Sequence, residues 1–145
     1  QLLAYTLSKS DERYENYNSG EYFPSFDDQR HRLRLVEMYK YRSWVVSAGW
    51  TFNTGSPVQI SETSSNVQFD RLTNFSQVDL GLVKRFKYKS ISFDAGVSLL
   101  NVMNHKNVLE TESFLVNDTN STSTVRSELT GISFTPVVYL SLRVN

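Results

Sequence analysis

The sequence predicts an all-β protein made of antiparallel transmembrane β-barrel strands. Three segments alternate large apolar residues with small or polar ones at the strand period of two: Ser43–Asn53, Val78–Phe86 and Ser90–Leu100. The first and third have the length of a tilted membrane-crossing strand, roughly 9–11 residues, rather than the roughly 5–6 of a soluble strand. Short and long connections also alternate along the chain, which is the loop order of an outer-membrane barrel.

The alternation assigns side chains to opposite faces of each strand. The apolar face of 43–53 carries Trp44, Val46, Ala48, Trp50 and Phe52, and that of 90–100 carries Ile91, Phe93, Ala95, Val97 and Leu99. The other face is polar or small. A soluble sandwich strand shows the same alternation, so the residue pattern alone leaves both a core and lipid open as the neighbour of the apolar face.

Six strands are expected in order, at 2–11, 29–39, 43–53, 76–86, 90–101 and 132–145. The register of 29–39 is ambiguous, because Glu37 falls on the face of Leu33 and Leu35 while Val36 and Met38 fall opposite; a bulge would resolve this. Tight turns are expected at 39–43 and 86–90, and long polar loops at 12–28, 54–75 and 101–131. Apolar patches at 108–116 and 125–129 predict a hairpin within the third loop. The chain begins inside a strand, which predicts a fragment.

The tight turns carry clustered basic and aromatic residues. The bases are Lys40, Arg42, Lys84, Arg85, Lys87 and Lys89, and the rings are Tyr39, Tyr41, Trp44, Phe86 and Tyr88. Amphipathic rings favour the boundary between hydrocarbon and water, so these five rings predict an interface girdle at the periplasmic rim. Alternatively, bases and rings only solvate and cover the ends of an ordinary sheet.

Composition narrows the class of protein. Mean hydropathy is −0.37, and no run of ~18 apolar residues exists, which argues against a helical membrane span. A barrel wall stays compatible with this value because half of each strand faces a wet lumen. Formal net charge is zero and cysteine is absent. These features argue against a nucleic-acid surface, disulfides and thiolate metal sites.

Candidate catalytic residues are few. Only His31 and His105 could act as bases at neutral pH, and nothing in their spacing identifies a nucleophile or a metal site. We therefore expect no enzyme, no metal and no cofactor. Asp27, Arg30 and His31 are expected to be structural, at the base of the first long loop.

Charged residues on the predicted lumen faces form a second candidate set. Asp79 and Asp94 are expected to pair with cations such as Arg34 or Arg143, or to contact a barrel plug.

Three segments, in this order, carry a family resemblance: EYFPSFDDQRH at 21–31, WTFNTGSPV at 50–58 and NVMNHKN at 101–107. They resemble the closing strands of TonB-dependent outer-membrane receptors, especially those of Bacteroidetes. The resemblance covers nearly the whole chain. It implies that residues 1–145 are the C-terminal part of a 22-stranded barrel in the outer membrane of a Gram-negative bacterium, with the plug domain outside this chain.

The resemblance also implies a function and partners. The parent protein would import a nutrient of unknown identity, with energy transmitted by TonB through the N-terminal part. Partners would be outer-membrane lipid, the rest of the barrel and its plug, and a surface lipoprotein or larger outer-membrane complex. Two alternatives stay open: a complete eight-stranded barrel acting as an adhesin or structural protein, and a soluble β-sandwich binding module.

Overall fold

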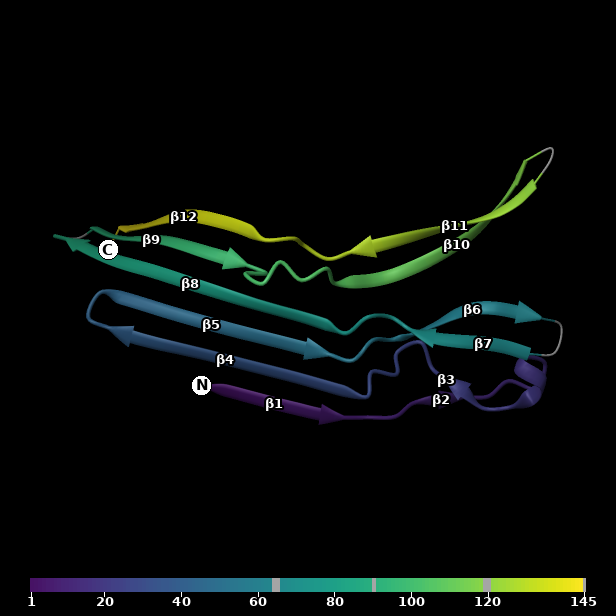
Figure 1. Ribbon diagram of the computed structural model, residues 1–145. Coiled ribbons are helices and arrows are strands. Elements are labelled where there is room, and N and C mark those ends of the chain that lie inside the picture. Colours follow the sequence, from purple (N-terminus) through teal and green to yellow (C-terminus); the bar gives the residue numbers. More distant parts are fainter. Residues whose placement is uncertain (64–65, 90, 119–120, 145) are drawn as a thin grey trace.

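The computed structural model describes residues 1–63, 66–89, 91–118 and 121–144, and it is all-β (Figure 1). Its strands are β1 (Leu2–Leu7), β2 (Asp11–Glu12), β3 (Phe23–Pro24), β4 (His31–Tyr41), β5 (Trp44–Asn53), β6 (Pro57–Thr63), β7 (Asn66–Arg71), β8 (Phe75–Tyr88), β9 (Ile91–Leu100), β10 (Val108–Asp118), β11 (Ser121–Thr130) and β12 (Thr135–Val144). A 3₁₀ helix, η1 (Asn18–Gly20), lies between β2 and β3. The predicted all-β class is confirmed, and every strand pair is antiparallel.

The main sheet contains the six predicted strands in the order β1-β4-β5-β8-β9-β12. The first strand is shorter than predicted because the chain leaves the ladder after Leu7, where Ser8 N donates to Arg30 O and Ser10 N donates to the Asp28 carboxylate. The predicted strand ends at Ser90 and Asn145 lie outside the described residues. β1 and β12 form the two edges of the sheet.

The ambiguous register of 29–39 is resolved without a bulge. β4 pairs without a register shift from Arg32 to Tyr41 with β5, and from His31 to Val36 with β1. A bulge would break this continuous pairing on both sides, so Glu37 stays on the apolar face, opposite Ala48.

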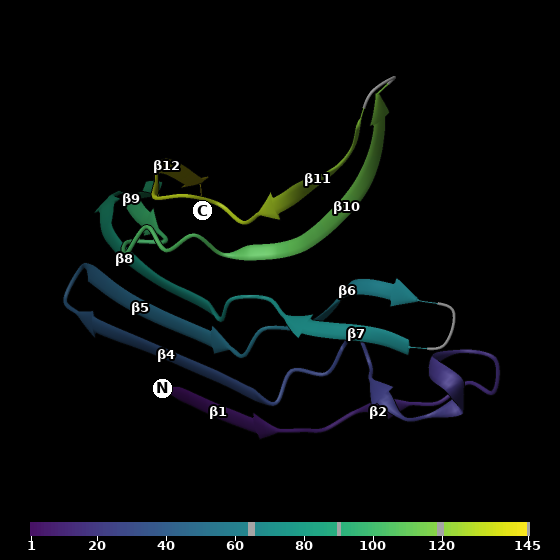
Figure 2. The ribbon, with the colours of Figure 1, turned by 45° about the vertical axis from the view of Figure 1, so that its right-hand side comes forward.

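The three long loops contain small sheets of their own, which lie beyond one end of the main sheet (Figures 1 and 2). They are the pairs β2–β3, β6–β7 and β10–β11. The hairpin predicted in the third loop is confirmed by β10 and β11. These two strands pair with each other and not with the main sheet, which does not fit their use as two more wall strands of an eight-stranded barrel.

The opposite end of the main sheet carries the tight turns. Arg42 and Lys89 occupy these turns with φ of 53° and 49°. A positive φ at the first turn position matches the right-handed twist of the flanking strands. Both ends of the chain also lie toward this end of the sheet (Figure 1).

Strand register gathers most of the large apolar side chains on one face of the main sheet, which we call the apolar face. The other is the polar face, although Leu2, Met38, Val137 and Tyr139 are exposed there. Exposed members of the apolar face are Leu3, Tyr5, Leu7, Leu35, Tyr39, Tyr41, Trp44, Val46, Trp50, Leu80, Leu82, Tyr88, Ile91, Phe93, Val138, Leu140 and Leu142. In β5 these apolar residues are exposed while their polar neighbours Ser47 and Thr51 are half-buried. Among the described residues Phe23, in a loop, is the only buried hydrophobic side chain. Large apolar side chains are therefore exposed along this face of the sheet.

Candidate functional site

The five rings predicted as a girdle lie on the apolar face at the tight-turn end. Tyr41 pairs with Trp44 across the β4–β5 turn, and Tyr39 pairs with Val46. Phe86 pairs with Phe93 and stacks on it with ring centroids 4.4 Å apart. The structure thus brings Tyr39, Tyr41, Trp44, Phe86 and Tyr88 together, and their role as a girdle stays a prediction.

Cations contact these rings. Arg42 lies 5.2 Å from the Tyr41 ring centroid and Lys89 lies 5.4 Å from that of Tyr88. Lys84 shares the apolar face, opposite both Trp44 and Ala95, and its ammonium lies 4.7 Å from the Trp44 ring and 5.1 Å from the Phe86 ring. Such contacts stabilise a cation more strongly where it is partly removed from water.

Asp79 and Asp94, two of the predicted lumen residues, occupy the polar face by register, and each has a partner there. Asp94 pairs with Arg85, its direct cross-strand neighbour, with Nε and Oδ1 3.0 Å apart. Asp79 accepts hydrogen bonds from the Gln77 side-chain amide and from Asn101 N. Both carboxylates thus have partners on the polar face, and their pairing with Arg143 or with a plug stays a prediction.

Arg34 and Arg143 remain on the polar face by register. Arg34 is exposed and opposite Thr51, and Arg143 is opposite Ser92. The side chain of Arg143 lies outside the described part of the chain.

An ion pair between the buried Asp28 and the partly exposed Arg71 closes the base of the first two loops. Asp28 is 2% exposed, and its Oδ2 lies 2.5 Å from Arg71 Nη2. Ser10 N donates to its Oδ1, and Arg71 Nη1 donates to the backbone oxygens of both Asp28 and Gly55. The hydrogen bond from Arg71 holds the pKa of Asp28 below its usual value, against the opposing effect of burial. Neither Asp28 nor Arg71 was a candidate from the sequence.

The predicted loop-base residues surround this pair. The Tyr5 hydroxyl and His31 Nδ1 lie 2.8 Å apart, and His31 N donates to Thr54 Oγ1. The Asp27 carbonyl accepts a long 3.5 Å contact from Arg32. Arg30 contributes its backbone oxygen, which accepts from Ser8 N. These contacts hold the loop ends together.

Two buried asparagines tie the third loop to the sheet. Asn101 is 0% exposed; its Nδ2 donates to the carbonyls of His105 and Ile132. Asn107 is 2% exposed; its Oδ1 accepts from Ser76 N at 2.8 Å and its Nδ2 donates to Ser76 O at 3.1 Å. The side-chain amide of Asn107 thus takes the place of a neighbouring strand.

Aromatic packing joins the first loop to β7. Phe23 is 4% exposed and stacks on Phe69 with ring centroids 5.4 Å apart. Tyr17 meets Phe23 edge-on at 4.9 Å, and Tyr14 lies 5.8 Å away. This cluster is a small core within the loops, separate from the main sheet.

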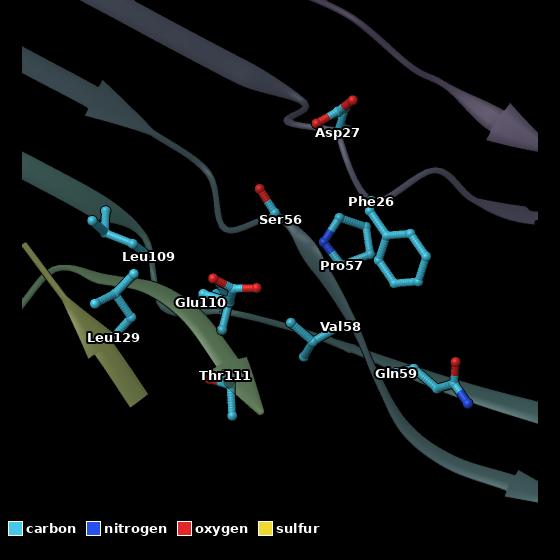
Figure 3. A pocket seen from close by; sticks show the side chains of 11 residues that line it. Phe26, Asp27, Ser56, Pro57, Val58, Gln59, Leu109, Glu110, Thr111 and Leu129 are labelled. Atoms are coloured by element: carbon cyan, nitrogen blue, oxygen red, sulfur yellow. The ribbon is translucent and has the colours of Figure 1, made fainter. Parts of the chain in front are cut away.

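A pocket of about 460 Å³ opens among the loops, as Figure 3 shows. Its lining comes from the first loop, from β6 and from the β10–β11 hairpin, and includes Phe26, Pro57 and Leu129. Asp27 and Glu110 are also among the lining residues. The lining therefore combines apolar residues with two acidic ones.

The two histidines occupy structural positions. His31 contacts Tyr5, and His105 Nδ1 lies 3.0 Å from Asn107 Oδ1. Over the described ranges, no three acidic, histidine or cysteine side chains form a group that could hold a metal ion. Among these residues, too, no helix has the length and apolar character that a membrane span requires.

No protein-family model, curated protein or solved structure matches this chain.

Proposed function

We propose that this chain is a wall segment of an outer-membrane β-barrel of the TonB-dependent receptor type, whose parent protein imports a nutrient. In this proposal the apolar face meets lipid, the polar face lines the interior, and the loops with their pocket lie outside the cell. The chain itself has no catalytic role.

The exposed apolar face is the observation that carries the proposal. Its exposed aromatic residues are 37–71% exposed, whereas soluble monomers rarely expose a contiguous apolar patch larger than roughly 300–600 Å². Within the described residues, no second sheet covers this face. Lipid accounts for a continuous face of this kind better than water does.

Strand length agrees with a membrane-spanning wall. β4 has 11 residues, which at about 3.3 Å per residue extend about 33 Å along the strand. A strand tilted by about 40° projects this length onto about 25 Å, the height of the apolar band of outer-membrane barrels.

Two polar groups near the loop end of the apolar face have partners within the chain. Trp50 Nε1 donates to Ser76 Oγ at 3.2 Å, and the Tyr5 hydroxyl meets His31. An unsatisfied polar group costs free energy in a hydrocarbon environment. These internal hydrogen bonds remove that cost near the loop end of the face.

Spin labelling at two adjacent residues tests the orientation of the wall. The chain contains no cysteine, so Ser47→Cys on the polar face and Ala48→Cys on the apolar face form a matched pair in β5. Each variant of the complete gene product would carry a nitroxide in lipid vesicles. We expect oxygen, which concentrates in lipid, to reach residue 48 preferentially, and a water-soluble nickel chelate to reach residue 47. Equal access of the nickel chelate to both labels would refute the lipid-facing wall.

The coding sequence upstream of Gln1 tests the receptor assignment separately. A plug-like domain followed directly by further barrel strands is expected. A signal peptide directly before Gln1 would refute a receptor barrel while leaving the lipid-facing sheet intact.

A further inference from the structure

We propose that the tight-turn end of the apolar face holds one anionic phospholipid, whose phosphate pairs with Lys84. The inference rests on the proposed membrane location of the sheet. It adds a specific ligand site that the wall function does not require.

Lys84 is unusual in its position. It is the only lysine or arginine on the apolar face of the described main sheet, where it lies opposite Trp44 and Ala95. The other turn cations in β4 and β8, Lys40, Arg85 and Lys87, belong to the polar face. A cation on an apolar face requires a compensating partner.

The rings supply only part of that compensation. Trp44 and Phe86 approach the ammonium from two sides, at 4.7 and 5.1 Å. Across the described ranges, the ion pairs involve Lys9, Arg71, Arg85 and Lys106, and no carboxylate reaches Lys84. Glu37, on the same face, pairs in register with Ala48, four residues along β5 from Trp44. The ammonium therefore keeps hydrogen-bonding capacity for an anion.

A lipid phosphate fits this position. Lys84 lies level with the β4–β5 turn, where a membrane-spanning sheet reaches the headgroups, and Arg42 and Lys89 at the turns make the surrounding potential positive. The rings of Trp44 and Phe86 offer apolar surface to the first carbons of an acyl chain. A phosphodiester with net negative charge satisfies the ammonium, whereas a zwitterionic lipid brings a competing cation.

Native mass spectrometry with matched variants tests the site. The complete gene product would be purified in mild detergent and mixed with equal amounts of phosphatidylglycerol and phosphatidylcholine. We expect wild type and Lys84→Arg to retain phosphatidylglycerol preferentially, and Lys84→Gln to lose about fivefold in that preference, the factor for one lysine at an anionic surface. Lys87→Gln, near the same end but on the polar face, serves as the control and should keep the wild-type preference.

Each other outcome overturns the site. If Lys84→Gln and wild type retained phosphatidylglycerol equally, Lys84 would not belong to the site. If Lys87→Gln lost as much preference as Lys84→Gln, the preference would come from the general positive charge of the turns and not from a specific site. Competition by millimolar inorganic phosphate, without any effect of lipid type, would indicate a free-ion site instead. A protein that stays soluble without detergent would refute the membrane proposal itself, a result separate from the lipid preference.

Discussion

Replacing Asn107 with leucine should loosen the start of β8 selectively. Ser76 pairs with Phe52 on the β5 side, while the pairing with β9 begins only at Leu80. On that second side, the backbone N–H and C=O of Ser76 bond to the Asn107 amide. Leucine has a similar volume and neither hydrogen-bonding group, so both backbone groups lose their partner.

The expected magnitude follows from those two groups. Each unsatisfied buried group costs about 1–3 kcal/mol, so two cost about 2–6 kcal/mol, with a central value of about 4 kcal/mol. Local opening would then be on the order of 1,000-fold more frequent. Hydrogen exchange measured by mass spectrometry should therefore accelerate by about that factor at Ser76, with much smaller changes in β4 and β5.

Asn104→Ala provides the comparison. Asn104 is exposed, and its Oδ1 accepts one hydrogen bond from Phe134 N. Loss of this hydrogen bond should accelerate hydrogen exchange less than Asn107→Leu does, and at Phe134 rather than at Ser76. Wild-type exchange at Ser76 in Asn107→Leu, or equal acceleration throughout the main sheet, would refute the local role assigned to Asn107.

Two further changes test the loop base. Asp28→Asn should lower the unfolding temperature at pH 7. Because the pKa of Asp28 is depressed in the folded state, the difference in unfolding temperature from wild type should shrink as pH falls below about 4. A difference in thermal scans that does not depend on pH would contradict the ion pair with Arg71. Gly55→Ala should lower the free energy of unfolding by at least about 1–3 kcal/mol, because the new Cβ would lie 1.7 Å from Leu72 O. Gly49→Ala should lower it less, because no atom lies nearer than 4.0 Å to the new Cβ. Equal denaturant midpoints for the two variants would contradict the close approach of Gly55 to Leu72.

Periodicity was enough to predict the main sheet. The alternation in 43–53 and 90–100 assigned each residue to the face it occupies, because one apolar face requires one register across all the strands. Lys84 could have been found in the same way, since it lies two residues beyond Leu82 and shares its face.

Contacts between distant loops could not be predicted from a single sequence. Asp28 and Arg71 are 43 residues apart, and nothing in the Asp27-Asp28 pair shows that the second carboxylate is the buried one. The motif at 101–107 was recognised, but its local pattern does not show that Asn107 reaches Ser76. Such pairings depend on where the loops cross, and no periodicity encodes that.

The placement of the polar contacts follows from the direction of the apolar face. A sheet that turns its large apolar side chains outward cannot use them as an internal core, so its loop ends need another source of order. Here the order comes from buried polar groups at the ends of the strands: the Asp28–Arg71 pair, and the amides of Asn101 and Asn107. Each of these groups bonds to backbone atoms of another segment. Such a hydrogen bond is stronger when it is removed from water than when it is exposed to it. These polar contacts therefore mark where the main sheet ends and the loops begin.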